Sequence, residues 1–185
     1  YPQYHSAEEK SFLGVTVAPQ GLPDPPGSLK AALDAISAHP NVGPFIGRQL
    51  IQRLVTSNPS PDYVGAVARV FANNGAGVRG DLKAVVKAIL MHPEARQVSD
   101  HSGKLREPAL MFTAVLRALN GSSDGDALGW WWGETLRQHV FNPPSVFNFY
   151  PPDYPLAGTS LVGPQFAIHN ANTALERFNY LTYLL

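Results

Sequence analysis

The sequence has no cysteine, no net charge and no long apolar run, and each absence excludes a class of protein. Without cysteine, the chain has no disulfide framework, no thiolate nucleophile and no cysteine zinc site. Its fourteen basic residues balance fourteen acidic ones, so we expect no nucleic-acid partner and no attraction to an anionic membrane. No apolar stretch reaches the roughly 18 residues that span a bilayer, which predicts no transmembrane segment.

What is present fits a globular protein. A chain of 185 residues is long enough for one domain with a core, and an apolar content of 44% is ordinary. The sequence begins at Tyr1 rather than Met, so we expect a processed product or a piece of something longer. The N-terminal region of such a parent would then be a partner of this chain.

One sequence pattern occurs twice and predicts the same local structure each time. Residues 80–96 contain Gly, Leu, Lys, Ala, Ala, Ile, His and Pro at the same spacing as residues 27–40. Each copy predicts an amphipathic helix that is capped at its start, by Ser28 in the first copy and by Asp81 in the second. A His-Pro pair ends each helix, because proline cannot continue it. The buried face of the first helix should be Leu29, Ala32, Leu33 and Ile36.

Further start and stop signals predict an all-α fold of about six to seven helices, with little or no sheet. Asn41 is an expected cap of the second helix, and Ser60-Pro61 begins the third. We expect an extended arm over residues 1–27 and a helical bundle over 28–121. Residues 122–185 should form a proline- and aromatic-rich irregular lobe with a C-terminal helix, and all three parts should pack as one domain.

A glycine-rich loop at residues 75–80 matches the G-x-G-x-x-G pattern of dinucleotide sites. That function requires a strand before the loop, whereas Ser60-Pro61 predicts a helix there. We therefore expect no cofactor. The loop precedes a helix N-terminus, where Gly77, Arg79 and Gly80 are a candidate anion-binding site; the alternative is a turn that lets two helices pack closely.

Three consecutive tryptophans, Trp130, Trp131 and Trp132, cannot all face the same way on a regular element. At least one should be exposed, where an indole can stack on a sugar or anchor a protein partner. The three are therefore candidates for ligand stacking. The alternative is that they fill the gap between the lobe and the bundle.

Candidate catalytic residues are few. Arg106 and Glu107 begin a helix, and Tyr150 and Asp153 lie in a proline-rich strip that can line a cleft. A buried Arg106 or Glu107 must be paired, so a structural ion-pair network is the alternative to catalysis. The six histidines lack the H-x-x-x-H spacing of a helical zinc site, and we expect no metal.

Five segments of the sequence, residues 5–14, 48–59, 80–96, 104–108 and 143–147, form a distinctive set. Together they resemble the C-terminal part of a bacterial family known as domain of unknown function number 1800. The resemblance implies an exported protein with a further N-terminal helical region, and it carries no catalytic residues. Asn148 departs from the glycine that such proteins usually have after Val-Phe, which puts a tight turn there in doubt.

The leading hypothesis is a noncatalytic helical binding or structural module of an exported or cell-envelope protein, working through protein or glycan contacts. One alternative is an exported hydrolase acting on a polymer such as a polysaccharide, and another is a subunit that assembles with copies of itself. Glu107 and Asp153 converging in one pocket would favour the hydrolase. Burial of Glu107 against arginine would count against it.

Overall fold

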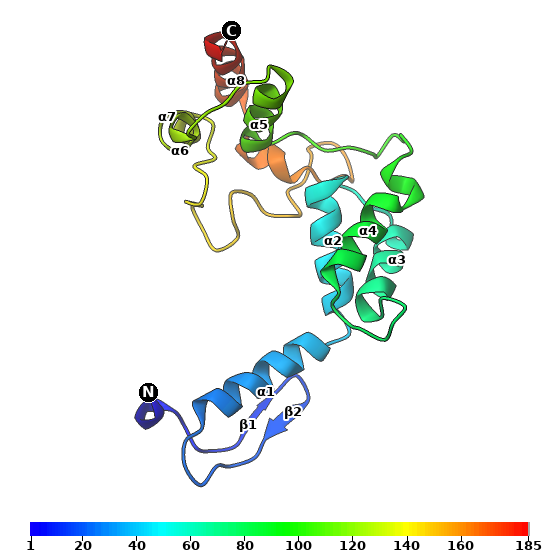
Figure 1. Ribbon diagram of the computed structural model, residues 1–185, viewed down its shortest axis with the longest axis vertical. Coiled ribbons are helices and arrows are strands. Elements are labelled where there is room, and N and C mark those ends of the chain that lie inside the picture. The colour runs from blue at the N-terminus through cyan, green and yellow to red at the C-terminus, as the bar shows by residue number, and fades with distance from the viewer. Residues whose placement is uncertain (185) are drawn as a thin grey trace.

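The computed structural model describes residues 1–184 and is an open chain of three helical parts (Figure 1). The prediction of a mainly helical fold with little sheet is confirmed. The N-terminal part contains η1 (Pro2–Tyr4), the antiparallel hairpin β1 (Lys10–Phe12) and β2 (Val15–Val17), and α1 (Pro25–Ala38). The middle part contains α2 (Val42–Leu54), α3 (Pro61–Ala72), α4 (Leu82–Met91) and η2 (Pro93–Ala95). The C-terminal part contains α5 (Pro108–Ala118), α6 (Asp126–Gly129), α7 (Trp131–Thr135), η3 (Pro164–Ile168) and α8 (Ala171–Leu184).

The main core lies between α2, α3 and α4. Its buried side chains come from one face of each helix: Ile51, Tyr63, Val67, Phe71, Val85 and Ile89. Glycine on α2 lets the helices approach closely, because a Cβ added at Gly47 would lie 3.1 Å from a methyl group of Val67. The caps predicted at Ser60 and Asp81 are confirmed, since each side chain accepts a hydrogen bond from a backbone N–H in the first turn.

A second, smaller core joins α5, α7 and α8. Phe112 and Tyr180 are buried with their ring centroids 5.4 Å apart. Trp132 packs edge-on against Tyr180, with centroids 4.8 Å apart. Within the described residues, no helix is long and apolar enough to cross a membrane.

One predicted cap is wrong, and a second is confirmed in position only. Helix α1 begins at Pro25 rather than after Ser28, and its N-cap is Asp24, which accepts a hydrogen bond from the Gly27 N–H at 3.0 Å. Ser28 is instead buried inside the first turn, where its hydroxyl bonds to two side chains of the N-terminal segment. Asn41 occupies the N-cap position of α2, but its side chain makes no capping bond.

The predicted buried face of α1 is also wrong. Leu29, Leu33 and Ile36 are 60%, 56% and 51% exposed. Helix α1 projects from the middle part together with the hairpin, as Figure 1 shows, so no helix covers this face in the described chain. Amphipathic spacing shows that a helix has an apolar face, but it does not specify what covers that face.

The prediction that a His-Pro pair ends both helices is confirmed. His39 and His92 are the C-caps of α1 and α4, and their backbone N–H groups donate to the carbonyls of Ile36 and Ile89. In both copies the ring Nδ1 then accepts a hydrogen bond from the backbone N–H two residues later, at 3.2 and 3.3 Å. Each histidine therefore ends one helix with its backbone, and its imidazole accepts from an N–H at the start of the next helical element.

Candidate functional site

Two of the four catalytic candidates meet in one polar network. Glu107 is half-buried at the N-cap position of α5, and its Oε2 accepts hydrogen bonds from the Tyr150 hydroxyl and from Gln138 Nε2, the latter at 2.8 Å. The other end of the Gln138 amide accepts from the Ala109 N–H, also at 2.8 Å. Gln138 thus links the carboxylate to the first turn of α5. The sequence offered no signal for it, because it is an isolated polar residue outside any periodic pattern.

The network holds Tyr150 as a proton donor. Tyr150 is only 2% exposed, and burial together with the bond to Glu107 raises the pKa of its hydroxyl well above the ordinary value. The Arg53 guanidinium lies over the tyrosine ring, 4.7 Å from its centroid. Burial also lowers the pKa of Lys104, whose ammonium group donates to the Arg53 carbonyl. Lys104 interacts electrostatically with the Glu107 carboxylate, and two neutral donors bind it directly.

The other two catalytic candidates lie apart from this network. Arg106 is exposed, and its carbonyl accepts a hydrogen bond from Arg177 Nη1 at 2.7 Å. Asp153 is exposed and makes no hydrogen bond to the network in the described part of the chain. Glu107 and Tyr150 therefore converge, whereas Arg106 and Asp153 do not join them.

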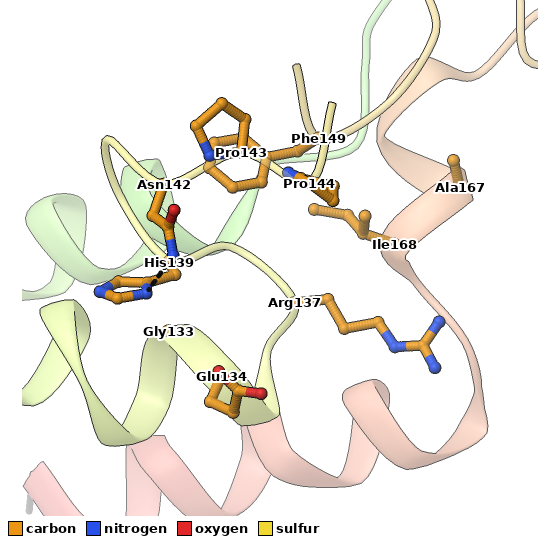
Figure 2. Close-up of a pocket in the computed structure, with 10 residues that line it drawn as sticks. All are labelled: Gly133, Glu134, Arg137, His139, Asn142, Pro143, Pro144, Phe149, Ala167 and Ile168. Carbon is orange, nitrogen blue, oxygen red and sulfur yellow. Dashed lines mark hydrogen bonds between the residues drawn. The ribbon is translucent and has the colours of Figure 1, made fainter. Parts of the chain in front are cut away.

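A pocket of about 510 Å³ opens between the end of α7, the loop that follows it and η3 (Figure 2). One wall is polar and includes a hydrogen bond of 3.2 Å between His139 Nδ1 and Asn142 Nδ2. The opposite side is apolar. The polar lining is Glu134, Arg137, His139 and Asn142, and the apolar lining includes Pro143, Pro144, Phe149 and Ile168.

The polar wall is built on a strained backbone. Arg137 has a φ of +58° and follows α7 at the position where helices usually end in glycine. The Gln138 N–H then donates to the Gly133 carbonyl at 2.8 Å, which closes the helix end. Phe141 has a φ of +65°. Left-handed backbone costs a side-chain-bearing residue about 1–2 kcal/mol, so the surrounding contacts must hold both positions in place.

The three tryptophans divide between surface and core. Trp130 and Trp131 are 80% and 75% exposed. Trp132 is half-buried against Tyr180. The Trp130 ring centroid lies 6.3 Å from that of His139, which places this indole beside the polar wall of the pocket. Ligand stacking stays a prediction, and only Trp130 and Trp131 are exposed enough for it.

The glycine-rich loop uses its donors internally. The side-chain oxygens of Asn73 and Asn74 accept hydrogen bonds from the four backbone N–H groups of residues 75–78, at 2.9 to 3.2 Å. Helix α3, not a strand, leads into the loop. Gly77 and Gly80 have φ values of +80° and +76°, which explains why glycine occupies these positions.

Arg79, the third residue of the predicted anion site, also has partners within the chain. Its Nε and Nη2 donate to the carbonyls of Ser37 and His39 at 3.0 and 3.1 Å, and its guanidinium lies over the Phe71 ring. The arginine therefore satisfies the C-terminal carbonyls of α1. Anion binding here stays a prediction, and an external anion would have to displace the asparagine acceptors. Within residues 1–184, no three His, Asp or Glu side chains gather into a possible metal site.

The family model described as "Protein of unknown function (DUF1800)" matches residues 1–181, so the chain belongs to this family. No curated protein and no solved structure matches the chain.

Proposed function

We propose that this chain is a noncatalytic helical module of an exported bacterial protein and that it works by contacting other proteins. The observation that carries the proposal is its surface. The chain exposes 12,181 Å² at a mass of 20.0 kDa. A compact folded monomer of this mass exposes about 8,700 Å². Export is the part of the proposal that comes from the family resemblance.

The repeated helix identifies the surface that fits a partner best. In α4, Val85 and Ile89 are fully buried against α2 and α3. The positions of α1 that correspond to this face are Ala32 and Ile36, and Ile36 is 51% exposed. Because the two helices share one pattern and differ in what covers them, α1 presents an uncovered copy of a face that packs against helices elsewhere in the chain.

The size of the excess surface fits a protein interface. The chain exposes about 3,500 Å² more surface than a compact monomer of its mass. This excess falls within the roughly 2,000–5,000 Å² that obligate interfaces bury. Candidate partners are a second copy of the chain, the N-terminal helical region of a longer parent, and another envelope protein. Lys30 and Asp34 form an ion pair on the exposed side of α1, so the helix has no net charge that would repel an identical copy.

The geometry supports a hydrolase less well. A catalytic carboxylate must reach the substrate, either as nucleophile or as general acid. Oε2 of Glu107 already accepts two hydrogen bonds from within the chain, and Asp153, the second carboxylate that such a mechanism would use, lies outside the network. The cluster therefore fits a structural role, in which buried polar groups satisfy one another.

Site-specific photo-crosslinking tests the proposal. A photoreactive phenylalanine analogue at Leu33 should form protein adducts in the producing cells, because this side chain lies on the uncovered face of α1. The same analogue at Asp34, on the same turn but in an exposed ion pair, is the matched control. Equal or absent adducts at both positions would refute the proposal. Sedimentation velocity on the purified chain would then show whether the partner is a second copy.

A further inference from the structure

We infer that the pocket between α7 and η3 binds a neutral saccharide, with Trp130 as a stacking platform at its edge. This function goes beyond protein contact through α1 and does not depend on it. Helix α7, which contributes to the pocket, lies in a different part of the chain from α1 (Figure 1).

The shape and chemistry of the pocket match a sugar. Its volume of about 510 Å³ falls within the range of small-molecule sites. A pyranose has an apolar C–H face and an edge of hydroxyl groups, so a complementary site needs one apolar wall and one wall of mixed donors and acceptors. Figure 2 shows this division, with Pro143, Pro144 and Phe149 gathered at one side and His139, Glu134 and Arg137 around the other.

The charges in the pocket favour an uncharged ligand. The guanidinium of Arg137 and the carboxylate of Glu134 have opposite signs, and both line the same space. Among the described residues, neither forms an ion pair within 4.0 Å, so each can bind hydroxyl groups of a ligand. A polyanion would be attracted by Arg137 but repelled by Glu134, whereas a neutral sugar can bond to both.

The polar wall is fixed before any ligand arrives. Arg137 and Phe141, on either side of His139, are both held in the left-handed region. The Asn142 N–H donates to the His139 carbonyl at 2.9 Å, and the two side chains are also hydrogen-bonded. A pre-formed site binds more tightly, because little conformational freedom remains to be lost on binding. Strain at functional positions is a recognised reason for residues to stay in rare conformations.

Trp130 extends the site beyond the pocket. Its indole is 80% exposed and lies beside His139. An exposed tryptophan next to a polar pocket gives a sugar ring a flat apolar surface, and the hydroxyl groups can reach the polar wall. Trp131 is exposed to a similar degree, but its ring makes no contact with His139 among the described residues, so it provides a matched control.

Calorimetric titration of the purified chain with cellotetraose, xylotetraose, maltotetraose and tri-N-acetylchitotriose tests the inference. We expect saturable binding of at least one of these probes. Trp130→Ala should weaken that binding by about tenfold, and Trp131→Ala should change it by less than about twofold. Circular dichroism of both variants should match the unmodified chain, because both side chains are exposed.

Three results would overturn the inference. The first is no binding of any probe up to about 10 mM, a concentration at which even weak sites saturate. The second is equal loss of binding in the Trp130 and Trp131 variants, which would indicate non-specific contact. The third is tighter binding of trigalacturonate than of every neutral probe, which would show that Arg137 dominates the site. None of these results bears on the photo-crosslinking at Leu33, so the two proposals can fail separately.

Discussion

Removing the hydroxyl of Tyr150 should destabilise the fold measurably at neutral pH. In Tyr150→Phe the ring keeps its place beneath Arg53, and the donor to Glu107 is lost. A hydrogen bond to a charged group contributes about 1.5–3 kcal/mol to stability. Gln138 continues to donate to the same carboxylate oxygen, so the carboxylate is not left without a partner. We therefore expect the free energy of unfolding to fall by about 2 kcal/mol at pH 7.

The stability lost in Tyr150→Phe should become smaller at alkaline pH. The folded-state pKa of Tyr150 is raised, so below the unfolded value of about 10 both states hold the proton and the stabilisation is complete. Above pH 10 the unfolded chain ionises first, and stability falls by about 1.4 kcal/mol per pH unit until the folded pKa is reached. The phenylalanine variant lacks this group. The difference in the free energy of unfolding between the two proteins should therefore fall from about 2 to about 0.6 kcal/mol by pH 11.

Urea unfolding of both proteins between pH 7 and 11 measures this gap. Comparing the two proteins is essential, because burial also raises the pKa values of Tyr63 and Tyr180 to about 12 and gives both proteins a similar alkaline loss. A variant as stable as the parent at pH 7, or a gap that stays constant to pH 11, would refute the hydrogen-bonded network around Glu107.

Two further predictions concern the repeated helix endings and the glycine-rich loop. His92→Ala should lower the free energy of unfolding by about 1 kcal/mol more than His39→Ala, because only the His92 ring is stacked on Tyr63, at 4.2 Å between centroids. Equal losses in urea unfolding would contradict this. Asn74→Ala should cost about 1 kcal/mol and speed the hydrogen exchange of Ala76 and Val78, because their N–H groups lose an acceptor. Unchanged exchange would show that water replaces the side chain at no cost.

Helix boundaries could be predicted from the sequence where they depend on neighbouring residues. Ser60 and Asp81 cap their helices because a side-chain oxygen three residues before a free N–H is a local arrangement. His-Pro ends two helices for an equally local reason, the missing N–H and the ring of proline. The prediction that Ser28 caps its helix is wrong, because Asp24 is a better cap and precedes a proline pair that starts the helix earlier.

The contacts between distant segments could not be predicted. The bond of Glu107 to Gln138 and Tyr150 joins residues 31 and 43 positions apart, across a loop whose course follows no periodic pattern. The sequence does not distinguish the four catalytic candidates, because all are polar and lie close to prolines. The course of the backbone brings only two of them together. The pocket depends on left-handed turns at Arg137 and Phe141, where the sequence lacks the glycine that would have signalled them.

The network around Glu107 and the pocket share one strained segment, and this gives the half-buried carboxylate a structural role. The left-handed residue Arg137 reverses the chain, so Gln138 reaches α5 and its two neighbours line the pocket. Glu107 and the Ala109 N–H hold the Gln138 amide from both ends, and this anchors the residues on either side of it. The charge on Glu107 thus supports the polar wall of the pocket, although Glu107 does not line it. Tyr150→Phe should therefore weaken saccharide binding as well as stability, whereas a catalytic Glu107 would have to reach the ligand itself.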